Sequence, residues 1–376
     1  MEFRHFLPVN IVFGKGKVSD VGELSKPYGK KALIVTGNSS AKKSGLYDKV
    51  KKSLDDSEID SVLFDKVTQN PLTTTAIEGA EFAKANGCDF VVAIGGGSIM
   101  DCAKGIAFLA VNDGDISDYI FSKLYSESAL PIVLIPTTCG TGSEGNGFAV
   151  LTNPDTGDKK SLRCGAIIAK VSIVDPDCMK TMPKKVLASV GFDALCHNIE
   201  AYTSKNATPF TDALSIYAIE LISKSIVKLY EGSEDEELWD MITVASTIGG
   251  MVINQAGVTL AHGMEHPASG LKDIVHGQGL AALTPVVIEA SYKGLPEKFA
   301  RISELLGGKD ETDCAKMIEE LLVKLNLKVG LKDLGLTEED IPWMADNCMK
   351  VSAAGISYNP VVFTRDEIAD LYKKAM

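Results

Sequence analysis

The segment Asp89–Lys104, DFVVAIGGGSIMDCAK, joins a short apolar run to three consecutive glycines and then to a helical pattern. A run of apolar and β-branched residues such as Phe90–Ile94 is typical of a strand that is buried on both faces of a parallel sheet. Glycines at the carboxyl end of such a strand allow a phosphate to approach the backbone closely, and a following helix, expected to begin near Ser98, offers it free N–H groups. We therefore predict that Gly95–Gly97 make room for a pyrophosphate. The alternative is a tight turn in which Ser98 and Asp101 form a capping box.

A second loop of the same kind follows the apolar run LPIVLI, which ends at Ile135. The residues after it, PTTCGTGSE (136–144), again combine glycines with hydroxyl side chains. The first loop matches neither the GxGxxG fingerprint nor the GxxxxGK[ST] phosphate loop. Open α/β sheets nevertheless bind ligands at the carboxyl ends of their strands, so two such loops on one sheet favour a nucleotide site.

The first half of the chain alternates short apolar runs with helical patterns. We predict strands and intervening helices, the strands at 31–36, 60–64, 89–94 and 131–136 and the helices at 44–54, 75–86 and 101–111. This alternation is typical of parallel βαβ units with helices on both faces of one sheet.

From about residue 181 the pattern changes, and apolar residues recur every three or four positions in segments separated by proline, glycine and charge. The helices expected in this half cover residues 183–203, 211–230, 235–254 and 297–307. No strand is expected after Val174. We therefore predict an α/β domain with a Rossmann-like dinucleotide-binding parallel sheet over residues 1–180 and an all-helical domain over residues 181–376.

Composition restricts the possible partners. The chain of 376 residues has a formal net charge of −12 and a pI of about 5.0, which disfavours binding to nucleic acid or to an anionic membrane through bulk electrostatics. No apolar run approaches the ~20 residues that span a bilayer, and the N-terminus lacks the pattern of a secretory signal. We expect a cytoplasmic protein whose eight cysteines, which form no CxxC pair, are reduced thiols.

Four of the five histidines fall in the helical half. Asp193 and His197 are four residues apart, so both project from one face of the predicted helix. Further along the chain, His262, His266 and His276 all lie within one segment of fifteen residues. A carboxylate with two or three imidazoles suits a divalent transition metal such as iron, zinc or nickel, so the pattern indicates a metal site.

The segment HGMEH (262–266) also matches the H-x-x-E-H motif of zinc peptidases, in which both histidines bind zinc and the glutamate activates water. That motif requires an uninterrupted helix. We expect Gly263 to weaken the helix and Pro267 to bias His266 away from helical geometry. A zinc hydrolase is therefore the weaker alternative.

The motifs GGGSIMDCAK, PTTCGTGSE, GFDALCHNIE, AHGMEHP and HGQG resemble, in the same order and spacing, those of the iron-containing (group III) alcohol dehydrogenase family. The resemblance extends from VNIVFGKG near the start to NPVVFTRDEIADLYKKA at the end. It implies an N-terminal nucleotide-binding domain and a C-terminal helical domain that binds the metal. Glycerol dehydrogenase and maleylacetate reductase are alternatives within the superfamily. A lyase related to dehydroquinate synthase is a more distant one, because the basic pocket that it needs is not found around residues 240–290.

Carried over residue by residue, the resemblance implies four ligands for Fe²⁺, namely Asp193, His197, His262 and His276. His266 would lie near the nicotinamide and the substrate, where it could relay a proton outward, so the residues acting in catalysis would be His266, Asp193 and His262. The resemblance also implies contacts to the pyrophosphate from Gly96, Gly97, Ser98 and Asp101, and contacts to the nicotinamide half from Thr137, Thr138 and Lys160. Four protein ligands would fill a tetrahedral zinc site, which favours Fe²⁺ over Zn²⁺ or another divalent ion.

The cofactor preference is predicted from Gly37, Ser39 and Ser40, which follow the first predicted strand. NAD sites generally place an acidic side chain near the adenosine ribose, and NAD-preferring relatives commonly carry Asp at the position of Gly37. Without that acid, and with hydroxyls and lysines nearby, we predict NADP(H), which would favour aldehyde reduction; a helix-capping turn is the alternative role of these residues. The expected substrate is a small primary alcohol or diol, such as butanol or 1,3-propanediol. The resemblance also implies a homodimer or a larger homo-oligomer.

Overall fold

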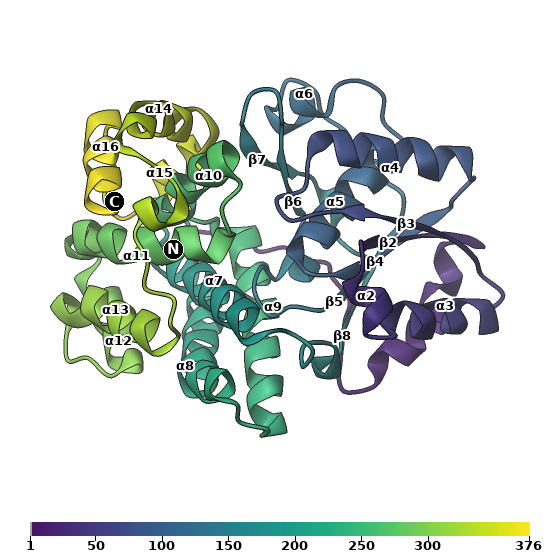
Figure 1. Ribbon diagram of the computed structural model, residues 1–376, viewed down its shortest axis with the longest axis horizontal. Helices are drawn as coiled ribbons and strands as arrows, with labels where there is room; N and C mark the ends of the chain where they lie inside the picture. The colour runs from purple at the N-terminus through teal and green to yellow at the C-terminus, as the bar shows by residue number, and fades with distance from the viewer. Residues whose placement is uncertain (1) are drawn as a thin grey trace. The chain divides into compact units, whose positions relative to one another are not determined.

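The computed structural model describes residues 2–376 and divides the chain into two compact units (Figure 1). The α/β unit comprises Leu7–Thr156 and Lys160–Met182. The helical unit comprises Pro183–Met376 together with Gly157–Lys159 and the N-terminal residues up to Phe6. The division therefore differs from a single boundary at residue 180, because two short segments belong with the helices.

Hydrogen bonds explain where these two segments belong. The carboxylate of Asp158 accepts from Asn347 Nδ2 at 2.7 Å and from Lys350 Nζ at 2.6 Å. Near the N-terminus, Gln255 Nε2 donates to the carbonyl oxygen of Arg4 at 2.7 Å. Contacts of this kind depend on residues far away in the sequence, so local patterns could not have predicted them.

Six strands of the α/β unit form one sheet in the order β1-β8-β5-β4-β2-β3, and each neighbouring pair is parallel. The strands are β1 (Ile11–Phe13), β2 (Lys31–Gly37), β3 (Asp60–Val67), β4 (Phe90–Gly95), β5 (Ile132–Pro136) and β8 (Val171–Val174). The predicted parallel sheet is confirmed, and β1 and β8 extend it. Because β3 lies on one side of β2 and β4 on the other, the strand order reverses there, and the carboxyl ends of β2 and β4 meet at this switch point.

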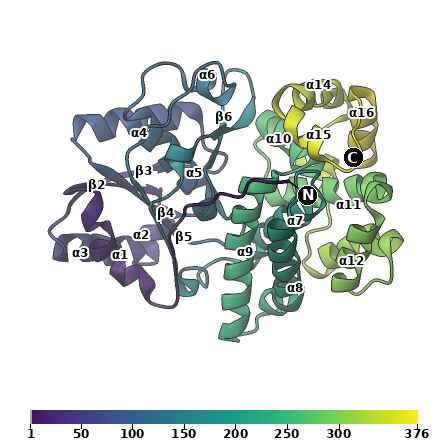
Figure 2. The ribbon, with the colours of Figure 1, turned by 180° about the vertical axis from the view of Figure 1, so that it is seen from behind.

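Alternate residues of the strands pack on opposite faces of this sheet, as their side-chain period of two requires. Leu33 and Val91 belong to the apolar core that contains side chains of α4 (Thr73–Ala85), α5 (Gly97–Leu109) and α6 (Ile116–Ile120). Ile34 and Val92 belong to a second core with α1 (Val21–Ser25), α2 (Ser40–Lys43) and α3 (Leu46–Asp56). Figures 1 and 2 show these two helical layers on either side of the strands.

A separate two-stranded sheet pairs β6 (Phe148–Thr152) with β7 (Lys159–Arg163). Local patterns in the sequence do not predict this sheet. Only one strand is apolar, since β7 reads KKSLR and its two buried residues, Lys159 and Leu162, lie three positions apart and do not follow the two-residue alternation of a half-buried strand. Short strands of this kind depend on tertiary packing more than on intrinsic propensity.

The helical unit confirms the predicted change of class, and in the described part of the chain no strand follows β8. Its α-helices are α7 (Lys184–Thr203), α8 (Pro209–Glu231), α9 (Glu236–Ala256), α10 (Leu260–Lys272), α11 (His276–Ser291), α12 (Pro296–Leu306), α13 (Cys314–Lys324), α14 (Ile341–Val351), α15 (Ala353–Tyr358) and α16 (Arg365–Lys374). Across residues 2–376, no single helix is long and apolar enough to cross a bilayer; only α9 and α10 taken together pass that test, and they are bent by 102°.

The expectation that Pro267 takes His266 out of helical geometry is wrong, because α10 continues through the proline to Lys272. Proline has no N–H to donate to the carbonyl four residues earlier, which belongs to Gly263. The thiol of Cys348 donates to that carbonyl instead, with Sγ at 3.2 Å from the oxygen. A partner from α14 therefore replaces the missing helical hydrogen bond.

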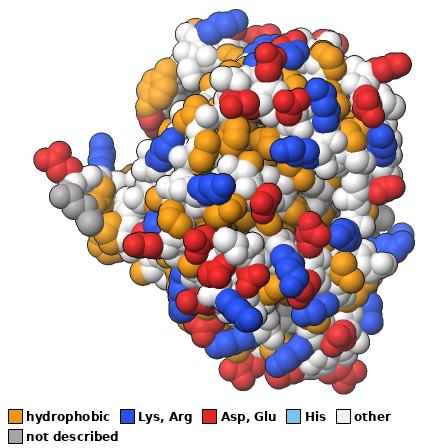
Figure 3. Space-filling view, turned by 90° about the vertical axis from the view of Figure 1, so that its left-hand side faces the viewer, with side chains coloured by type: hydrophobic (Ala, Val, Ile, Leu, Met, Phe, Trp, Pro, Cys, Tyr) orange, Lys and Arg blue, Asp and Glu red, His pale blue; other side chains and the backbone are white. Residues whose placement is uncertain are grey.

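Charges of both signs are interspersed on the face of the helical unit shown in Figure 3. The helical unit contains exposed ion pairs: Lys328 Nζ lies 2.8 Å from the carboxylate of Glu319, and Lys373 Nζ lies 2.9 Å from that of Asp370. Exposed pairs of this kind contribute little stability individually. The mixed surface gives no single-sign patch on this face.

Candidate active site

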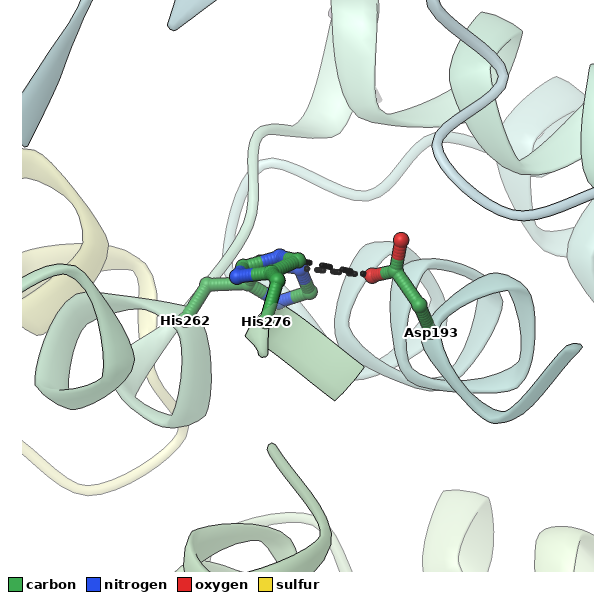
Figure 4. Close-up of side chains that lie close together, drawn as sticks. All are labelled: Asp193, His262 and His276. Atoms are coloured by element: carbon green, nitrogen blue, oxygen red, sulfur yellow. Dashed lines mark hydrogen bonds and ion pairs between the residues drawn. The ribbon is translucent and has the colours of Figure 1, made fainter. Parts of the chain in front are cut away.

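Three helices of the helical unit bring three of the predicted histidines around one carboxylate oxygen of Asp193. Asp193 Oδ1, on α7, lies 3.3 Å from His262 Nε2 and 3.5 Å from His276 Nε2 (Figure 4). His197 Nε2, one helical turn from Asp193, lies 3.6 Å from the same oxygen. Ligand atoms of Asp193, His262 and His276 all lie within 4.8 Å of one another. The arrangement has the donor types and the spacing that a divalent metal needs.

The imidazole rings are packed against one another as well as facing the carboxylate. The rings of His197 and His262 are stacked, with centroids 4.5 Å apart and planes inclined by 16°. The ring of His266 lies beside the cluster, with its centroid 6.4 Å from that of His262 and 6.2 Å from that of His276. The structure therefore places His266 next to the four converging residues and outside the group whose donor atoms face Asp193.

Close approach of the helices depends on positions that lack a side chain. A Cβ atom added at Gly277, in the first turn of α11, would lie 2.2 Å from the carbonyl oxygen of Ser189 on α7. One added at Gly279 would lie 2.9 Å from Cγ of Glu265 on α10. Neither distance is possible for a real side chain. Glycine at these positions therefore lets α11 bring His276 against α7 and α10.

Two buried carboxylates hold the far side of the imidazoles. Glu200 Oε1 lies 2.5 Å from His262 Nδ1, and Glu265 Oε2 lies 2.5 Å from His276 Nδ1. An ionised carboxylate only accepts hydrogen bonds, so each Nδ1 carries the proton and donates it. The Nε2 atoms are then the nitrogens that can bind a metal, and they are the ones that face Asp193.

The charges of the cluster favour a cation at its centre. Burial would raise the pKa of Asp193, but the imidazoles of His197 and His276 outweigh it and hold that pKa well below its usual value. Burial lowers the pKa of His197 to about 4. Burial would also lower the pKa of His262, but the carboxylates of Glu200 and Asp193 outweigh burial and raise this pKa to about 10. The carboxylates therefore stabilise positive charge where the Nε2 atoms meet.

Glu265 is already engaged in the protein, which argues against the zinc-hydrolase alternative. One of its oxygens accepts from the hydroxyl of Ser269, and the other contacts His276 and Lys159 Nζ, the latter at 3.3 Å. It is completely buried. A glutamate that activates water must be free to take a proton from it. These contacts are the evidence against a hydrolase. The helix break expected at Pro267, which was the earlier argument against it, does not occur.

In the α/β unit, the predicted nucleotide residues gather at the switch point of the sheet. Gly37 ends β2, Ser39 directly precedes α2, and Ser40 is the first residue of that helix; Gly95 ends the neighbouring strand β4. No side-chain hydrogen bond caps the start of α5 or of α2. The capping-box and helix-capping alternatives are therefore not what the structure shows at these two loops.

The glycine loop is also packed against the second loop, which explains two of its glycines. A Cβ atom on Gly96 would lie 2.8 Å from Thr138 Oγ1, and one on Gly97 would lie 2.3 Å from Thr141 Cγ2. In the sequence these glycines were interpreted as space for a pyrophosphate or, alternatively, as a tight turn. The structure shows that the close contact of the two loops already requires them.

The remaining predicted cofactor residues have separate surroundings. Both carboxylate oxygens of Asp101 accept hydrogen bonds within the protein, from Ser143 Oγ at 2.5 Å and from the backbone N–H of Val150 at 2.9 Å. Lys160 Nζ lies 5.7 Å from the centre of the Phe121 ring.

A cavity of about 200 Å³ lies beside the carboxyl edge of the sheet. Thr137, which follows β5, and Ser40 both line it, as does Lys49. Two predicted cofactor residues from different loops therefore face the same space.

Comparisons with known proteins identify the family. Sequence profiles described as "Iron-containing alcohol dehydrogenase" and "Fe-containing alcohol dehydrogenase family, C-terminal" match residues 8–176 and 187–376. The chain belongs to the iron-containing alcohol dehydrogenase family. It is 37% identical over 383 residues to the 1,3-propanediol dehydrogenase of Citrobacter freundii, with 99% of this chain and 98% of that protein covered.

Solved structures of this family have the same fold. An archaeal halo-thermophilic alcohol dehydrogenase from a Red Sea brine pool has a TM-score of 0.96 and 36% identity, covering 100% of this chain and 99% of its own. The NADH-dependent butanol dehydrogenase A of Thermotoga maritima has a TM-score of 0.92 and 32% identity, covering 100% and 98%. Membership of this iron-containing dehydrogenase family makes the chain an oxidoreductase that acts on alcohols.

The residues present fit the iron that the family name implies. Three imidazole nitrogens and one carboxylate oxygen converge, and both donor types bind Fe²⁺ readily. The proton on each Nδ1 of His262 and His276 is held by a carboxylate, as is usual around metal-binding histidines.

Three further residues of this cluster were not predicted as partners of the histidines, and for two of them a signal was present in the sequence. Glu200 lies seven residues after Asp193 and three after His197, so it projects from the same face of α7. Glu265 lies three residues after His262 on α10. Lys159, which pairs with Glu265, had no such signal because β7 is far from α10 in the sequence.

Proposed function

We propose that this chain is an iron-dependent, NADP(H)-dependent oxidoreductase that interconverts a small primary alcohol or diol and its aldehyde. The observation that carries the proposal is the convergence of the Nε2 atoms of His197, His262 and His276 on Asp193 Oδ1. Asp193, His197, His262 and His276 would hold the ion. When bound, the ion would supply Lewis acidity, which lowers the pKa of an alcohol hydroxyl and polarises an aldehyde carbonyl.

Residues of the chain itself would set the net charge of this site and transfer protons to and from it. Asp193 would reduce the net charge of the centre. Burial lowers the pKa of His266 well below its ordinary value, and Lys159 adds to this effect. His266 would therefore be neutral at pH 7 and able to accept a proton during alcohol oxidation or pass one inward during aldehyde reduction.

We assign nucleotide binding to residues 1–180 and metal and substrate binding to residues 181–376. The uncapped N-terminus of α5 supports a pyrophosphate site at Gly96–Ser98, because the first N–H groups of a helix and its dipole attract an anion. The nicotinamide would carry the hydride. Thr137 and Thr138 would contact its half of the cofactor from the loop packed against Gly96.

The preference for NADP(H) is supported by the turn between β2 and α2. Gly37 offers no carboxylate at the end of β2, and α2 carries Lys42 and Lys43. Lys42 forms an ion pair with Asp65, and both side chains are partly exposed. Asp65 offsets the charge of Lys42, so Lys43 is the cation that would attract a ribose 2′-phosphate, whereas a carboxylate at position 37 would repel it.

The preference is tested by comparing kcat/KM for NADPH and NADH in the wild type and in Gly37→Asp. We expect a clear preference for NADPH in the wild type and a shift toward NADH in the variant. A Cβ at Gly37 would come within 3.3 Å of the carbonyl oxygen of Val67, so the variant requires only a small adjustment. A wild-type preference for NADH would overturn this part of the proposal.

The activity itself is tested by anaerobic reduction of an aldehyde panel that includes butanal and 3-hydroxypropanal. The metal-free protein and protein reloaded with Fe²⁺ are compared, with NADPH oxidation as the signal. We expect turnover only in the reloaded sample. Absence of turnover in a sample shown to contain one bound iron per chain would contradict the proposal.

A further inference from the structure

The buried carboxylate of Glu200 is surrounded by hydrogen-bond donors. Oε1 lies 2.5 Å from His262 Nδ1. Oε2 accepts from the backbone N–H of Thr259 at 2.6 Å and from its hydroxyl at 3.1 Å, at the start of α10. Oε1 thus accepts a hydrogen bond from the imidazole of His262, whereas Oε2 accepts hydrogen bonds from Thr259, the residue that precedes α10.

An amide could not serve both purposes. Glutamine has the shape of glutamate, but one of its two terminal atoms is an NH₂ donor. If its oxygen stays with Thr259, the NH₂ faces His262 Nδ1, which must then accept a hydrogen bond and pass its proton to Nε2. A protonated Nε2 has no lone pair for a metal. If the amide turns over, two N–H donors oppose each other at Thr259 instead.

The buried carboxylate of Glu265 has a different set of partners. Oε2 faces His276 Nδ1 at 2.5 Å and Lys159 Nζ at 3.3 Å, while Oε1 faces the hydroxyl of Ser269. A hydroxyl can accept as well as donate. Glutamine at this position could therefore keep its oxygen on His276 and donate its NH₂ to Ser269, whose own proton has the carbonyl of Ile274 within 3.5 Å.

We propose that Glu200 is a positioning residue that commits His262 to the tautomer with a free Nε2, and that Glu265 performs the corresponding task for His276 in surroundings that tolerate an amide. The inference rests on the metal site of the proposed function. It predicts that two isosteric substitutions, each removing one buried negative charge next to a ligand histidine, have unequal effects on the metal.

The test compares metal-free wild type, Glu200→Gln and Glu265→Gln. The dissociation constant for Co²⁺ is measured by competition with a chelator. We expect Glu200→Gln to weaken binding about 10- to 100-fold, as loss of an outer-shell partner commonly does. Glu265→Gln should stay near the wild-type value. X-ray absorption of the proteins saturated with Zn²⁺ should show one imidazole ligand fewer in Glu200→Gln alone.

Two further variants separate positioning from folding. Thr259→Ala removes a donor to Glu200 Oε2 but keeps the contact between Oε1 and His262, so it should lower the unfolding temperature and leave the imidazole count unchanged. If Glu200→Gln does not fold, Glu200→Asp is used; its shorter carboxylate keeps the charge but cannot reach both partners, so Co²⁺ affinity should still fall.

The inference is overturned if Glu200→Gln and Glu265→Gln weaken Co²⁺ binding equally, or if Glu200→Gln or the substitute Glu200→Asp binds like the wild type. A wild type that binds neither Co²⁺ nor Zn²⁺ would contradict the proposed function itself. The two failures are therefore distinguishable.

Discussion

The two units of this chain build their candidate sites from different parts of the polypeptide. At the switch point of the α/β unit, the distinguishing features are missing side chains at Gly37 and Gly95–Gly97 and the uncapped start of α5. In the helical unit, the candidate site consists of side chains from three helices, and the residues that could hold a metal extend from Asp193 to His276. The site in the α/β unit therefore depends on short glycine-containing segments at the ends of two strands, whereas the site in the helical unit depends on single side chains from three helices. Variants of the two units test this contrast, with expected effects that range from loss of the metal to a small change in cofactor affinity.

Deleting one imidazole should abolish the side-chain site. His262→Ala removes the nitrogen that lies 3.3 Å from Asp193 Oδ1 and leaves the buried carboxylate of Glu200 without its partner. We expect bound metal to fall to background, and turnover with it. Metal content per chain and kcat/KM measure the effect. His5→Ala is the control, because the ring of His5 lies in the N-terminal segment and packs on Phe210 of α8 instead of facing Asp193. One full equivalent of metal in His262→Ala would contradict the ligand assignment.

The α/β unit also contains one buried charge whose effect depends on pH. Lys104 Nζ is fully buried and donates to oxygens of Ser143, Asn146 and Phe148. Burial lowers its pKa from 10.5 to about 8, although Asp101 and Glu144 oppose the shift. Between about pH 8 and pH 10.5 the unfolded chain binds the proton that the folded chain has lost, so this group makes the free energy of unfolding rise with pH.

Wild type and Lys104→Met are therefore compared by urea unfolding across that interval. The difference in unfolding free energy, wild type minus variant, should increase with pH by about 1–3 kcal/mol, since one unit of pKa corresponds to about 1.4 kcal/mol. Below pH 8 the difference should be constant. A difference that falls as the pH rises would mean that Lys104 keeps its proton more tightly in the folded state.

Adding one methyl group should disturb the backbone site. The Cβ of Gly96→Ala would lie 2.8 Å from Thr138 Oγ1 but 3.6 Å from Thr138 Cβ. We expect a loss of about 1–3 kcal/mol in unfolding free energy from overpacking. The double variant Gly96→Ala/Thr138→Ala, which removes the overlapping atoms, should recover most of this loss. Thermal unfolding tests both, and an equal loss in the two variants would show that the overlap is not the cause.

Deleting a side chain from the same loop should have the smallest effect. If the pyrophosphate is held mainly by backbone N–H groups at the start of α5, Ser98→Ala removes at most one hydrogen bond from a hydroxyl to a charged group, and we expect a loss of ~1.5 kcal/mol, the low end for such a bond, because the backbone donors remain. The dissociation constant for NADPH, measured by fluorescence, should rise by about tenfold or less. A much larger loss would make the two sites alike and would remove the contrast between them.

Much of the fold follows from local patterns. The apolar runs that become β2, β4 and β5 are buried on both sides and alternate with helical segments, which is sufficient to predict parallel βαβ units. The edge strand β1 has three residues, and β7 is largely polar, so neither has a recognisable pattern. Their strands depend on hydrogen-bonding partners that the sequence places far away.

The candidate metal residues were also predictable in type, but their outer partners were only partly so. The four-residue spacing of Asp193 and His197 and the closely spaced histidines of α10 and α11 indicated a metal site. Glu200 had a helical spacing that could have been noticed. Glu265 was considered only as the water-activating glutamate of the weaker hydrolase alternative, because only its contacts with His276, Ser269 and Lys159 show that it is engaged.

The amino-acid sequence by itself determined the two structural classes and the chemical types of the site residues, because strand burial, helical spacing and the metal preferences of imidazole and carboxylate are local properties. Only the tertiary structure decided which nitrogen of His262 and of His276 faces Asp193 and why Gly96 and Gly97 lack side chains. Those outcomes depend on atoms that approach within hydrogen-bonding or van der Waals distance from distant parts of the chain.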